Sequence, residues 1–279
     1  MIRVAESFRE HDQEVRVMDF ARLTFSIKDG AIRVGCGDEF PDIVDSFDAC
    51  LARPLKRRDL PTLLFSLNAL SALSKGGLPV INDPMAYVVA ASKLGQYLEL
   101  SRAGLPLPDT VSSLDAGRLL GSVQRGTYLV EKPICGSRGK GVRRVHAGDE
   151  RHNPPETVSL YQQDLSGMSF DIRVFTVGYK VVAGMKRVSS SLTTNVSRGG
   201  KPERIALDKE LADLAERASK ATGAEVAGTD IVIDRGGRPY ILEVNAQPDF
   251  IGLETVTDAD IASEISEYAV KRAEERRIV

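Results

Sequence analysis

The stretch VEKPICGSRGKGV, residues 130–142, combines three glycines, one serine and three cationic side chains in one short segment. Residues 127–133 read as a strand that leads into a loop, and residues 142–147 read as a returning strand. These strand–loop–strand flanks exclude a Walker loop, in which GK[ST] opens a helix. They also exclude a dinucleotide-binding fingerprint, in which the glycines lead into a helix. A different kind of glycine loop is therefore predicted.

The composition of this loop favours an anionic ligand. Glycine lets the backbone approach phosphate oxygens closely, and successive N–H groups can converge on an anion. Against one carboxylate, Glu131, the segment 131–144 carries five cations, a balance that suits a polyphosphate. The five are Lys132, Arg138, Lys140, Arg143 and Arg144. The alternative is an ordinary β-hairpin with a solvated basic tip, and the loop alone does not decide between them.

The chain as a whole is close to neutral, in contrast to this segment. It has 279 residues, a formal net charge of −2, and 42% hydrophobic and 27% charged residues, which is ordinary for a globular protein. Because nucleic-acid and membrane-surface binders are usually strongly basic, we expect neither kind of partner. The length allows two or three small domains, each with its own core.

The cysteines and histidines give no indication of a zinc site, a disulfide framework or a histidine base. Cys36, Cys50 and Cys135 are an odd number without metal-ligand spacing, which predicts reduced thiols in a cytoplasmic protein. The N-terminus lacks a signal-peptide pattern, and no apolar run is long enough to span a membrane. The three histidines are widely spaced in charged or loop-like sequence, which argues against a histidine base.

The predicted elements change in character along the chain. The first 85 residues read as an α/β segment. Its expected elements are a helix over 2–11, a strand over 14–19, a strand over 47–55, a helix over 60–77 and a strand over 78–83. One helix is expected over 84–104, with Pro84 at its start and Gly104 at its end. From residue 170 strands dominate, so the fold class is α+β rather than a regular βαβ series.

A second chemical pattern lies in YILEVNAQP, residues 240–248. Residues two apart on a strand share a face, so Glu243 and Asn245 point the same way. Asp230, on the other arm of a predicted hairpin, adds a third oxygen-bearing side chain, and oxygen-only sets suit Mg²⁺. The alternative is that Glu243 pairs with a cation and Asp230 caps a turn. The apolar neighbours of Asp230 favour the metal interpretation, because an unpaired buried charge is costly.

A third polar stretch, MKRVSSSLTTNVSRGG, covers residues 185–200. It carries Lys186, Arg187 and Arg198 among many hydroxyl groups. Its length and polarity predict an ordered binding loop. The alternative is a solvated, mobile surface loop.

Seven motifs in order over residues 80–260 resemble the RimK-like ATP-grasp carboxylate-amine ligases. They are NDPMAYVVAASK, VEKPICGSRGKGV, LYQQDL, DIRVFTVG, TTNVSRGG, AGTDI and LEVNAQP. The resemblance implies an ATP-grasp fold with an α/β pre-grasp domain over 1–85, a lid domain over 86–163 and a catalytic α+β domain over 164–279. Members of the family usually begin with a strand before the first helix, so this chain either starts short or has a smaller first sheet.

The resemblance also implies the residues of a site in which ATP lies between two domains, with the glycine loop as a lid. The implied ATP-binding residues are Lys93, Lys132, Gly136, Ser137, Gly139, Gly141, Gln162, Gln163, Asp164, Leu165, Asp171, Thr193, Thr194 and Asn195. Asp230, Glu243 and Asn245 match the family's metal ligands and would hold two Mg²⁺ ions, with Mn²⁺ as a substitute. Arg187 and Arg198 are predicted to grip the substrate carboxylate and the transferring phosphoryl group.

The chemistry implied by the resemblance begins with attack of a carboxylate on the γ-phosphate, which forms an acyl phosphate and ADP. An amine then attacks the acyl carbon and releases phosphate. We expect L-glutamate as the amine and a coenzyme, such as tetrahydromethanopterin or the deazaflavin coenzyme, as the acceptor. The alternatives are the C-terminus of a ribosomal or amino-group carrier protein, and an ATP-binding regulator without turnover. A homo-oligomer is also expected.

Overall fold

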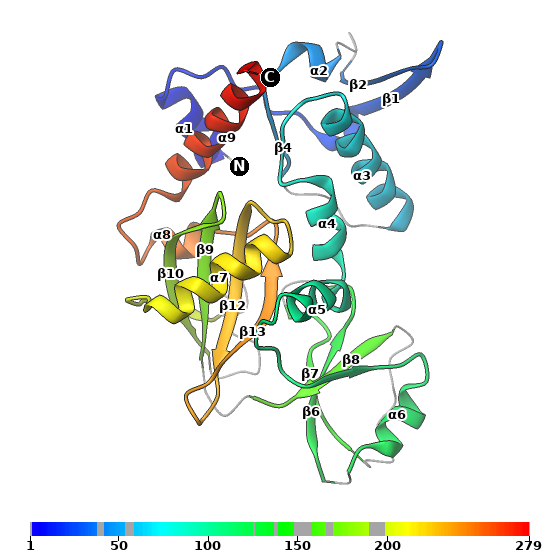
Figure 1. Ribbon diagram of the computed structural model, residues 1–279, viewed down its shortest axis with the longest axis vertical. Helices are drawn as coiled ribbons and strands as arrows, with labels where there is room; N and C mark the ends of the chain where they lie inside the picture. The colour runs from blue at the N-terminus through cyan, green and yellow to red at the C-terminus, as the bar shows by residue number, and fades with distance from the viewer. Residues whose placement is uncertain are drawn as a thin grey trace.

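The computed structural model describes residues 2–37, 42–53, 59–124, 126–136, 139–147, 158–165, 170–189 and 199–278 (Figure 1). An α/β segment comes first, followed by a four-stranded antiparallel sheet at the bottom of Figure 1 and a five-stranded antiparallel sheet in its middle. The fold class is α+β, as the sequence predicts.

The N-terminal segment is built around a small parallel pair of strands. Its elements are α1 (Ile2–Glu10), β1 (Leu23–Lys28), β2 (Ala31–Cys36), α2 (Ile43–Ser46), β3 (Cys50–Leu51), α3 (Leu60–Lys75) and β4 (Val80–Ile81). The pair β3 and β4 is parallel, and α3 packs beside it through Leu70 and Leu73. The helix α3 begins where the Asp59 side chain accepts a hydrogen bond from Thr62 N, a standard N-cap.

The strand expected over 14–19 is wrong, and the strands of this region lie further along the chain. Residues 13–19 have no regular structure, and β1 and β2 form the antiparallel hairpin instead. Val17 is 59% exposed, so the alternating pattern does not bury its apolar side chains against a sheet.

The single helix expected over 84–104 is also wrong, because the chain forms two helices there. They are α4 (Pro84–Ala91) and α5 (Lys93–Arg102). Between them Ser92 is extended, and its hydroxyl accepts a hydrogen bond from Gly95 N at 3.2 Å, which caps α5. The break leaves Lys93 N free to donate to Ile134 O at 3.0 Å. This hydrogen bond joins the start of α5 to the residue that follows the strand β6 (Tyr128–Pro133).

The four-stranded antiparallel sheet contains the strands on either side of the glycine loop. Its order is β5-β8-β6-β7, from β5 (Thr110–Ser112), β6 (Tyr128–Pro133), β7 (Arg143–His146) and β8 (Ser159–Gln163). The helix α6 (Ala116–Ser122), which the sequence did not reveal, packs through Leu120 against Leu129, Val145 and Tyr161. Hereafter this sheet and α6 are called the lid.

The five-stranded sheet is antiparallel throughout, in the order β11-β10-β9-β12-β13. Its strands are β9 (Phe170–Val177), β10 (Lys180–Val188), β11 (Lys201–Arg204), β12 (Val226–Ile233) and β13 (Pro239–Asn245). The helix α7 (Lys209–Ala221) crosses the near face in Figure 1. Leu211 and Leu214 of α7 belong to the same buried cluster as Ile172 and Val174 of β9.

Among the residues that the structure describes, apolar side chains pack on the opposite face of this sheet at one end. There Phe175 and Met185 pack with α8 (Ile251–Glu254) and α9 (Ile261–Ile278), through Leu253 and Ile265 among others. Further along the same face the inward side chains are charged. Three of the predicted site residues, Asp171, Arg187 and Asp230, lie at this polar end of the sheet.

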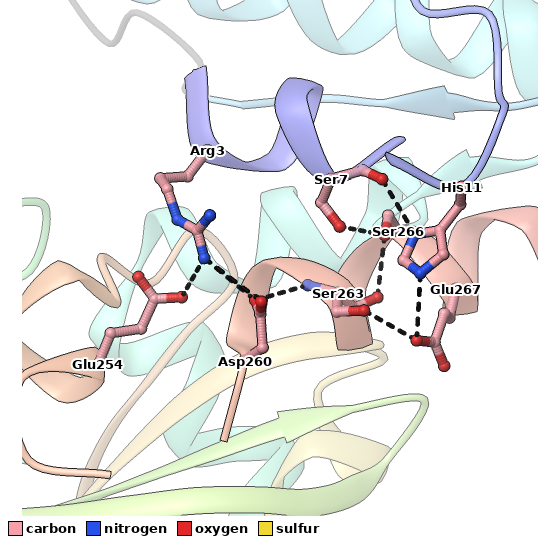
Figure 2. Close-up of polar contacts among 8 residues, drawn as sticks. All are labelled: Arg3, Ser7, His11, Glu254, Asp260, Ser263, Ser266 and Glu267. Carbon is pink, nitrogen blue, oxygen red and sulfur yellow. Dashed lines mark hydrogen bonds and ion pairs between the residues drawn. The ribbon is translucent and has the colours of Figure 1, made fainter. Parts of the chain in front are cut away.

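The two ends of the chain pack together, because α1 lies against α9 (Figure 2). The hydroxyls of Ser7 and Ser266 are 2.8 Å apart and buried, and Arg3 donates to Asp260 at 3.3 Å. His11 Nδ1 lies 2.9 Å from Ser7 O. A helix of the expected first domain therefore rests on a helix of the expected third domain, and the proposed domain boundaries stay a prediction.

The three cysteines are free thiols. Burial raises the pKa of the Cys50 thiol to about 11, so this thiol is protonated at neutral pH. Among the described residues, no helix is both long and apolar enough to cross a membrane.

Candidate active site

Four charged side chains meet on the face of the five-stranded sheet that α7 does not cover. Asp171 and Arg173 are two apart on β9, and they point away from α7 because Ile172 between them points toward it. The strand register sets Arg187 of β10 opposite Asp171, and Asp230 of β12 opposite Arg173. The antiparallel pairing of three strands therefore builds this cluster.

The four side chains form a buried ion-pair network. Arg173 Nε and Nη2 each donate to one oxygen of Asp230 at 2.8 Å. Arg187 Nε and Nη2 donate to the two oxygens of Asp171 at 2.7 and 2.5 Å, and Arg187 Nη2 is also 2.9 Å from Asp230 Oδ2. Arg187 is only 2% exposed, so the network lies almost entirely out of water. Such charges are tolerated inside a protein only when each is paired.

Electrostatic interactions within the network keep Asp230 and Arg187 charged. Burial raises the pKa of Asp230, but the nearby guanidinium groups of Arg173 and Arg187 more than offset this, and the pKa lies below its ordinary value. Burial lowers the pKa of Arg187, and attraction to Asp230 and Asp171 reverses the sign, so this pKa is raised. Asp230 thus remains a carboxylate at neutral pH, the state that a metal ligand requires.

The three predicted metal ligands lie on this same face. Asp230 is paired across the strands with Glu243, and Gly228 is paired with Asn245 two residues further. Asp230 lies within a strand and does not cap a turn, which removes that part of the alternative. A carboxylate has about four acceptor positions, and Arg173 and Arg187 use three on Asp230, which leaves one for a cation.

The donor set is two carboxylates and one amide, all oxygen donors, and it therefore fits Mg²⁺. Within the described part of the chain, no group of three His, Cys, Asp or Glu side chains gathers at metal-binding distance. The amide of Asn245 is therefore an essential part of the predicted site, and the role of these three residues stays a prediction.

Lys132 brings a cation from the lid to this cluster. Burial lowers its pKa to about 8; Glu243, Asp230 and Asp171 act in the opposite direction, and Lys93 adds to the lowering. These interactions place the Lys132 ammonium within electrostatic reach of carboxylates on the other sheet. Lys93, 9% exposed, donates from Nζ to Gly136 O at 3.4 Å, beside the glycine loop.

A chain of hydrogen bonds connects Lys132 to the strand that carries Glu243. Lys132 Nζ donates to Gln162 Oε1 at 2.6 Å, and Gln162 Nε2 donates to the Tyr97 hydroxyl at 2.6 Å. Tyr97 in turn donates to Leu242 O at 2.9 Å. Burial raises the pKa of Tyr97, so the hydroxyl keeps the proton that it donates. The lid and the five-stranded sheet are therefore joined through α5.

The sequence did not indicate that side chains of α5 contact both the lid and β13. Besides Tyr97, Gln96 of this helix accepts a hydrogen bond from Val244 N at 2.8 Å, next to Glu243 and Asn245. The sequence offers only two adjacent polar residues within a predicted helix, Gln96 and Tyr97, and this does not indicate which strand they contact.

Gln163, Asp164 and Leu165, which are also predicted to bind ATP, lie at the end of β8 and just beyond it. Gln163 is exposed, Leu165 is half-buried, and Asp164 forms an ion pair with Arg144, with Arg144 Nε 2.7 Å from Asp164 Oδ2. The predicted residues Ser137, Thr193, Thr194, Asn195 and Arg198 lie outside the described residues.

Two described glycines of the loop adopt backbone conformations that favour glycine. Gly136 is exposed, and Gly139 and Gly141 have positive φ angles of 63° and 77°. A Cβ at Gly141 would lie 2.8 Å from Pro133 Cγ, so a side chain at this position would clash with the end of β6.

A four-stranded lid sheet together with a five-stranded sheet that carries charged side chains on one face is the arrangement expected of an ATP-grasp ligase. Residues 104–269 match the model of the RimK-like ATP-grasp domain. The chain belongs to this RimK-like ATP-grasp family of carboxylate-amine ligases. Enzymes of the family use ATP and Mg²⁺ and bind carboxylate and amine substrates.

Two relatives illustrate the family's named activities. The chain is 30% identical over 261 residues to a tetrahydromethanopterin:α-L-glutamate ligase of Methanosarcina acetivorans, covering 81% of each chain. It is 31% identical over 283 residues to a probable α-L-glutamate ligase of Hydrogenovibrio crunogenus, covering 97% of this chain and 91% of the relative.

Solved structures share the fold over almost the whole chain. The ATP-grasp ligase PsnB, solved with a phosphomimetic variant of its minimal precursor, Mg and ADP, has a TM-score of 0.72 at 23% identity and covers 97% of this chain and 94% of its own. A RimK-domain protein of Sphaerobacter thermophilus has a TM-score of 0.68 at 20% identity, over 96% of this chain and 94% of its own. At this identity the likeness shows the fold alone.

Proposed function

We propose that this enzyme uses ATP to join L-glutamate to a substrate carboxylate through an acyl phosphate. The observation that carries the proposal is the convergence of Asp230, Glu243 and Asn245 on one sheet face, within electrostatic reach of Lys132 from the lid. A triphosphate needs hard-oxygen metal ligands on one side and cations on the other, and this arrangement offers both.

The proposed positions of the ligands follow from this geometry. Lys93 and Lys132 would contact the phosphates, and residues 162–165 at the end of β8 would hold the adenine. Asp230, Glu243 and Asn245 would hold one or two Mg²⁺ ions, which neutralise charge on the triphosphate when bound. The exposed Gly136 and the positive-φ glycines beside it would bring backbone N–H groups to the phosphates.

The proposed reaction has two steps. An oxygen of the acceptor carboxylate bonds to the γ-phosphorus, and the bond to the β-phosphate oxygen breaks to release ADP. The α-amine of glutamate then bonds to the acyl carbon, loses a proton and displaces phosphate. The protein's part is to align the two substrates, balance their charge and exclude water from the acyl phosphate.

The ion pairs favour a positioning role for Arg187. Its guanidinium already contacts Asp171 and Asp230, and it could reach a substrate only by exchanging one of these partners. In our proposal Arg187 therefore holds Asp230 in place for the metal. Arg198 remains the candidate for gripping the phosphoryl group or the acceptor.

A coenzyme is the acceptor that the relatives favour. The relative from Methanosarcina acetivorans is named for tetrahydromethanopterin and glutamate, which supports a coenzyme carboxylate as the acceptor. The deazaflavin coenzyme belongs to the same chemical class. A protein C-terminus is the competing acceptor, and both belong in the test.

The test is a screen for ADP release in which candidate coenzymes and carboxyl-terminal peptides are crossed with the amino acids. We expect ADP formation that depends on both substrates, a product heavier by one glutamyl residue, and a hydroxamate when hydroxylamine intercepts the acyl phosphate. ATP binding without turnover under every combination would contradict the proposal and favour a regulator.

A matched pair of variants tests the metal site. Glu243→Gln should lower ADP formation by about 100-fold or more, because it removes one charged ligand from the metal. Glu203→Gln serves as the control, since Glu203 is an exposed acid on the edge strand of the same sheet. Full turnover by Glu243→Gln would refute the metal assignment.

A further inference from the structure

Arg53 lies where the N-terminal segment meets the five-stranded sheet. It lies two residues after the end of β3, and the parallel strands β3 and β4 both end at this boundary. Just after β4, Asn82 Nδ2 donates to Val226 O and to Ala246 O, each at 2.8 Å. The carboxyl ends of β3 and β4 therefore abut the start of β12 and the end of β13. Carboxyl ends of parallel strands are where α/β units bind ligands.

The guanidinium of Arg53 is held firmly but has one unsatisfied group. Its Nη2 donates to Pro248 O, and its Cζ lies 5.3 Å from the centroid of the Phe250 ring. Its Nη1 is buried and has no hydrogen-bond partner among the described residues. A buried charged donor without an acceptor is unfavourable, so this nitrogen is suited to a ligand that supplies one. Tyr87 and Asp249 are the other ionisable groups that influence it.

The aromatic neighbour of Arg53 places it on the same face of the five-stranded sheet as the buried ion-pair network. Phe250 packs edge-on against Phe175, with ring centroids 6.1 Å apart and an interplanar angle of 84°. Phe175 follows Asp171 and Arg173 on the same face of β9. Arg53 therefore covers the end of this face nearest the N-terminal segment.

The backbone partner of Arg53 leads back to the predicted metal ligands. Pro248 covers Gly228, where an added Cβ would lie 2.9 Å from Pro248 Cβ and 3.5 Å from Arg173 Nε. Gly228 is paired with Asn245, and Arg173 holds Asp230. The contacts run without interruption from Arg53 to the cluster, while Lys132 approaches that cluster from the lid.

We infer that Arg53 Nη1 binds a substrate carboxylate. The site lies on the sheet face that carries Asp230, at the end of that face that is farther from the lid. The inference rests on the proposed ligase function. An arginine suits this task because its guanidinium keeps its positive charge, so Nη1 can donate a charge-assisted hydrogen bond to a carboxylate oxygen while Nη2 stays on Pro248 O. The carboxylate has two possible sources, the acceptor and the α-carboxylate of the incoming amino acid, and the kinetic arms below separate them.

The first test measures KM for each substrate separately in Arg53→Met and Arg53→Lys. Loss of one charge-assisted hydrogen bond should raise the KM of one carboxylate substrate by about 10- to 100-fold in Arg53→Met, with KM for ATP unchanged. Arg53→Lys keeps the charge without the planar fork and should give an intermediate value. A rise for glutamate alone identifies its α-carboxylate, and a rise for the acceptor alone identifies the acceptor.

Arg276→Met is the matched control. Arg276 also joins distant segments, because it donates from α9 to Phe47 O at 2.9 Å and Val44 O at 3.2 Å, but its partners are both backbone carbonyls. This variant should leave all three KM values unchanged. Unchanged carboxylate KM values in Arg53→Met, or an equal rise for ATP, would overturn the inference. Thermal melting of each variant establishes that it is folded, and Arg53→Lys replaces Arg53→Met if the latter unfolds.

A binding experiment keeps this inference separate from the proposed function. Calorimetry would titrate L-glutamate, and then each acceptor, into the wild-type protein and Arg53→Met in the presence of a non-hydrolysable ATP analogue. Weaker binding of one of them to Arg53→Met supports the inference, and equal binding of all of them refutes it, whatever the turnover. Absence of wild-type turnover in the ADP screen would instead count against the proposed function.

Discussion

The buried ion-pair network makes a quantitative prediction about stability. Arg187→Met removes a guanidinium that contacts both Asp171 and Asp230, and replaces it with a flexible apolar chain that can fill the same space. The variant leaves two buried carboxylates with one fewer cation. We expect a large loss of stability, because the remaining charges cannot reach water.

The magnitude follows from the contacts and the burial. Arg187 is 2% exposed and makes contacts of 2.7, 2.5 and 2.9 Å, so solvent screens the pairs little. Removing one partner of a buried pair costs about 3–5 kcal/mol. Asp230 keeps both hydrogen bonds to Arg173, so the loss falls mainly on Asp171, and we expect about 3 kcal/mol. For a chain of this size the melting temperature should fall by about 6–12 °C.

Thermal unfolding, followed by circular dichroism at pH 7, is the assay. The double variant Arg187→Met/Asp171→Asn removes the stranded charge together with its partner, and should recover at least about 1 kcal/mol relative to the sum of the single variants. Arg204→Met is the control, because Arg204 and Asp258 form an exposed pair with side chains 68% and 82% exposed. Such a pair contributes about 0–1 kcal/mol.

Two results would refute this reasoning. In the first, Arg187→Met melts no lower than Arg204→Met, and the buried contacts then contribute no more than an exposed pair. Alternatively, the effects of Arg187→Met and Asp171→Asn could be strictly additive, which would show that the two side chains do not depend on each other. Either outcome would also remove the basis for assigning Arg187 the task of holding Asp230.

Two further predictions concern the site itself. Because the pKa of Lys132 is about 8, its positive charge is lost as the pH rises through that value, so KM for ATP should increase between about pH 7 and 9. Lys132→Arg should remove this increase, and the same increase in both proteins would contradict the assignment. Gly228→Ala would set a methyl group 2.9 Å from Pro248 Cβ, and should lower turnover by displacing the segment after Asn245. In the control, Gly121→Ala, the added methyl meets no atom within 4 Å, and turnover should be unchanged; equal effects of the two would refute the close-contact argument.

Local pattern was enough to predict much of this molecule. The apolar spacing of Leu211, Leu214 and Ala218 predicts α7, because a helix turns once in about 3.6 residues. The alternation around Glu243 and Asn245 predicts their common face, because a strand has a period of two. The order of short motifs indicated the family, and the family model matches.

Local pattern failed where a tertiary contact overrides it. Nothing in residues 84–104 requires a break at Ser92, and the break becomes understandable only once Lys93 N meets Ile134 O of the lid. Residues 14–19 alternate like a strand, yet Val17 remains exposed. Propensity within a short window is a weak preference, and contacts with distant segments decide the outcome.

The sequence by itself determined the types of side chain that the site contains, and the tertiary structure decided their partners. The motif around Asp230 predicts a carboxylate ligand, but the pairing of Asp230 with Arg173 and Arg187 depends on the register of three strands. The same holds for Arg53, whose partner Pro248 lies 195 residues away along the chain. Side-chain chemistry is a property of the residue, whereas burial and pairing are properties of the packed chain, and no local window contains them.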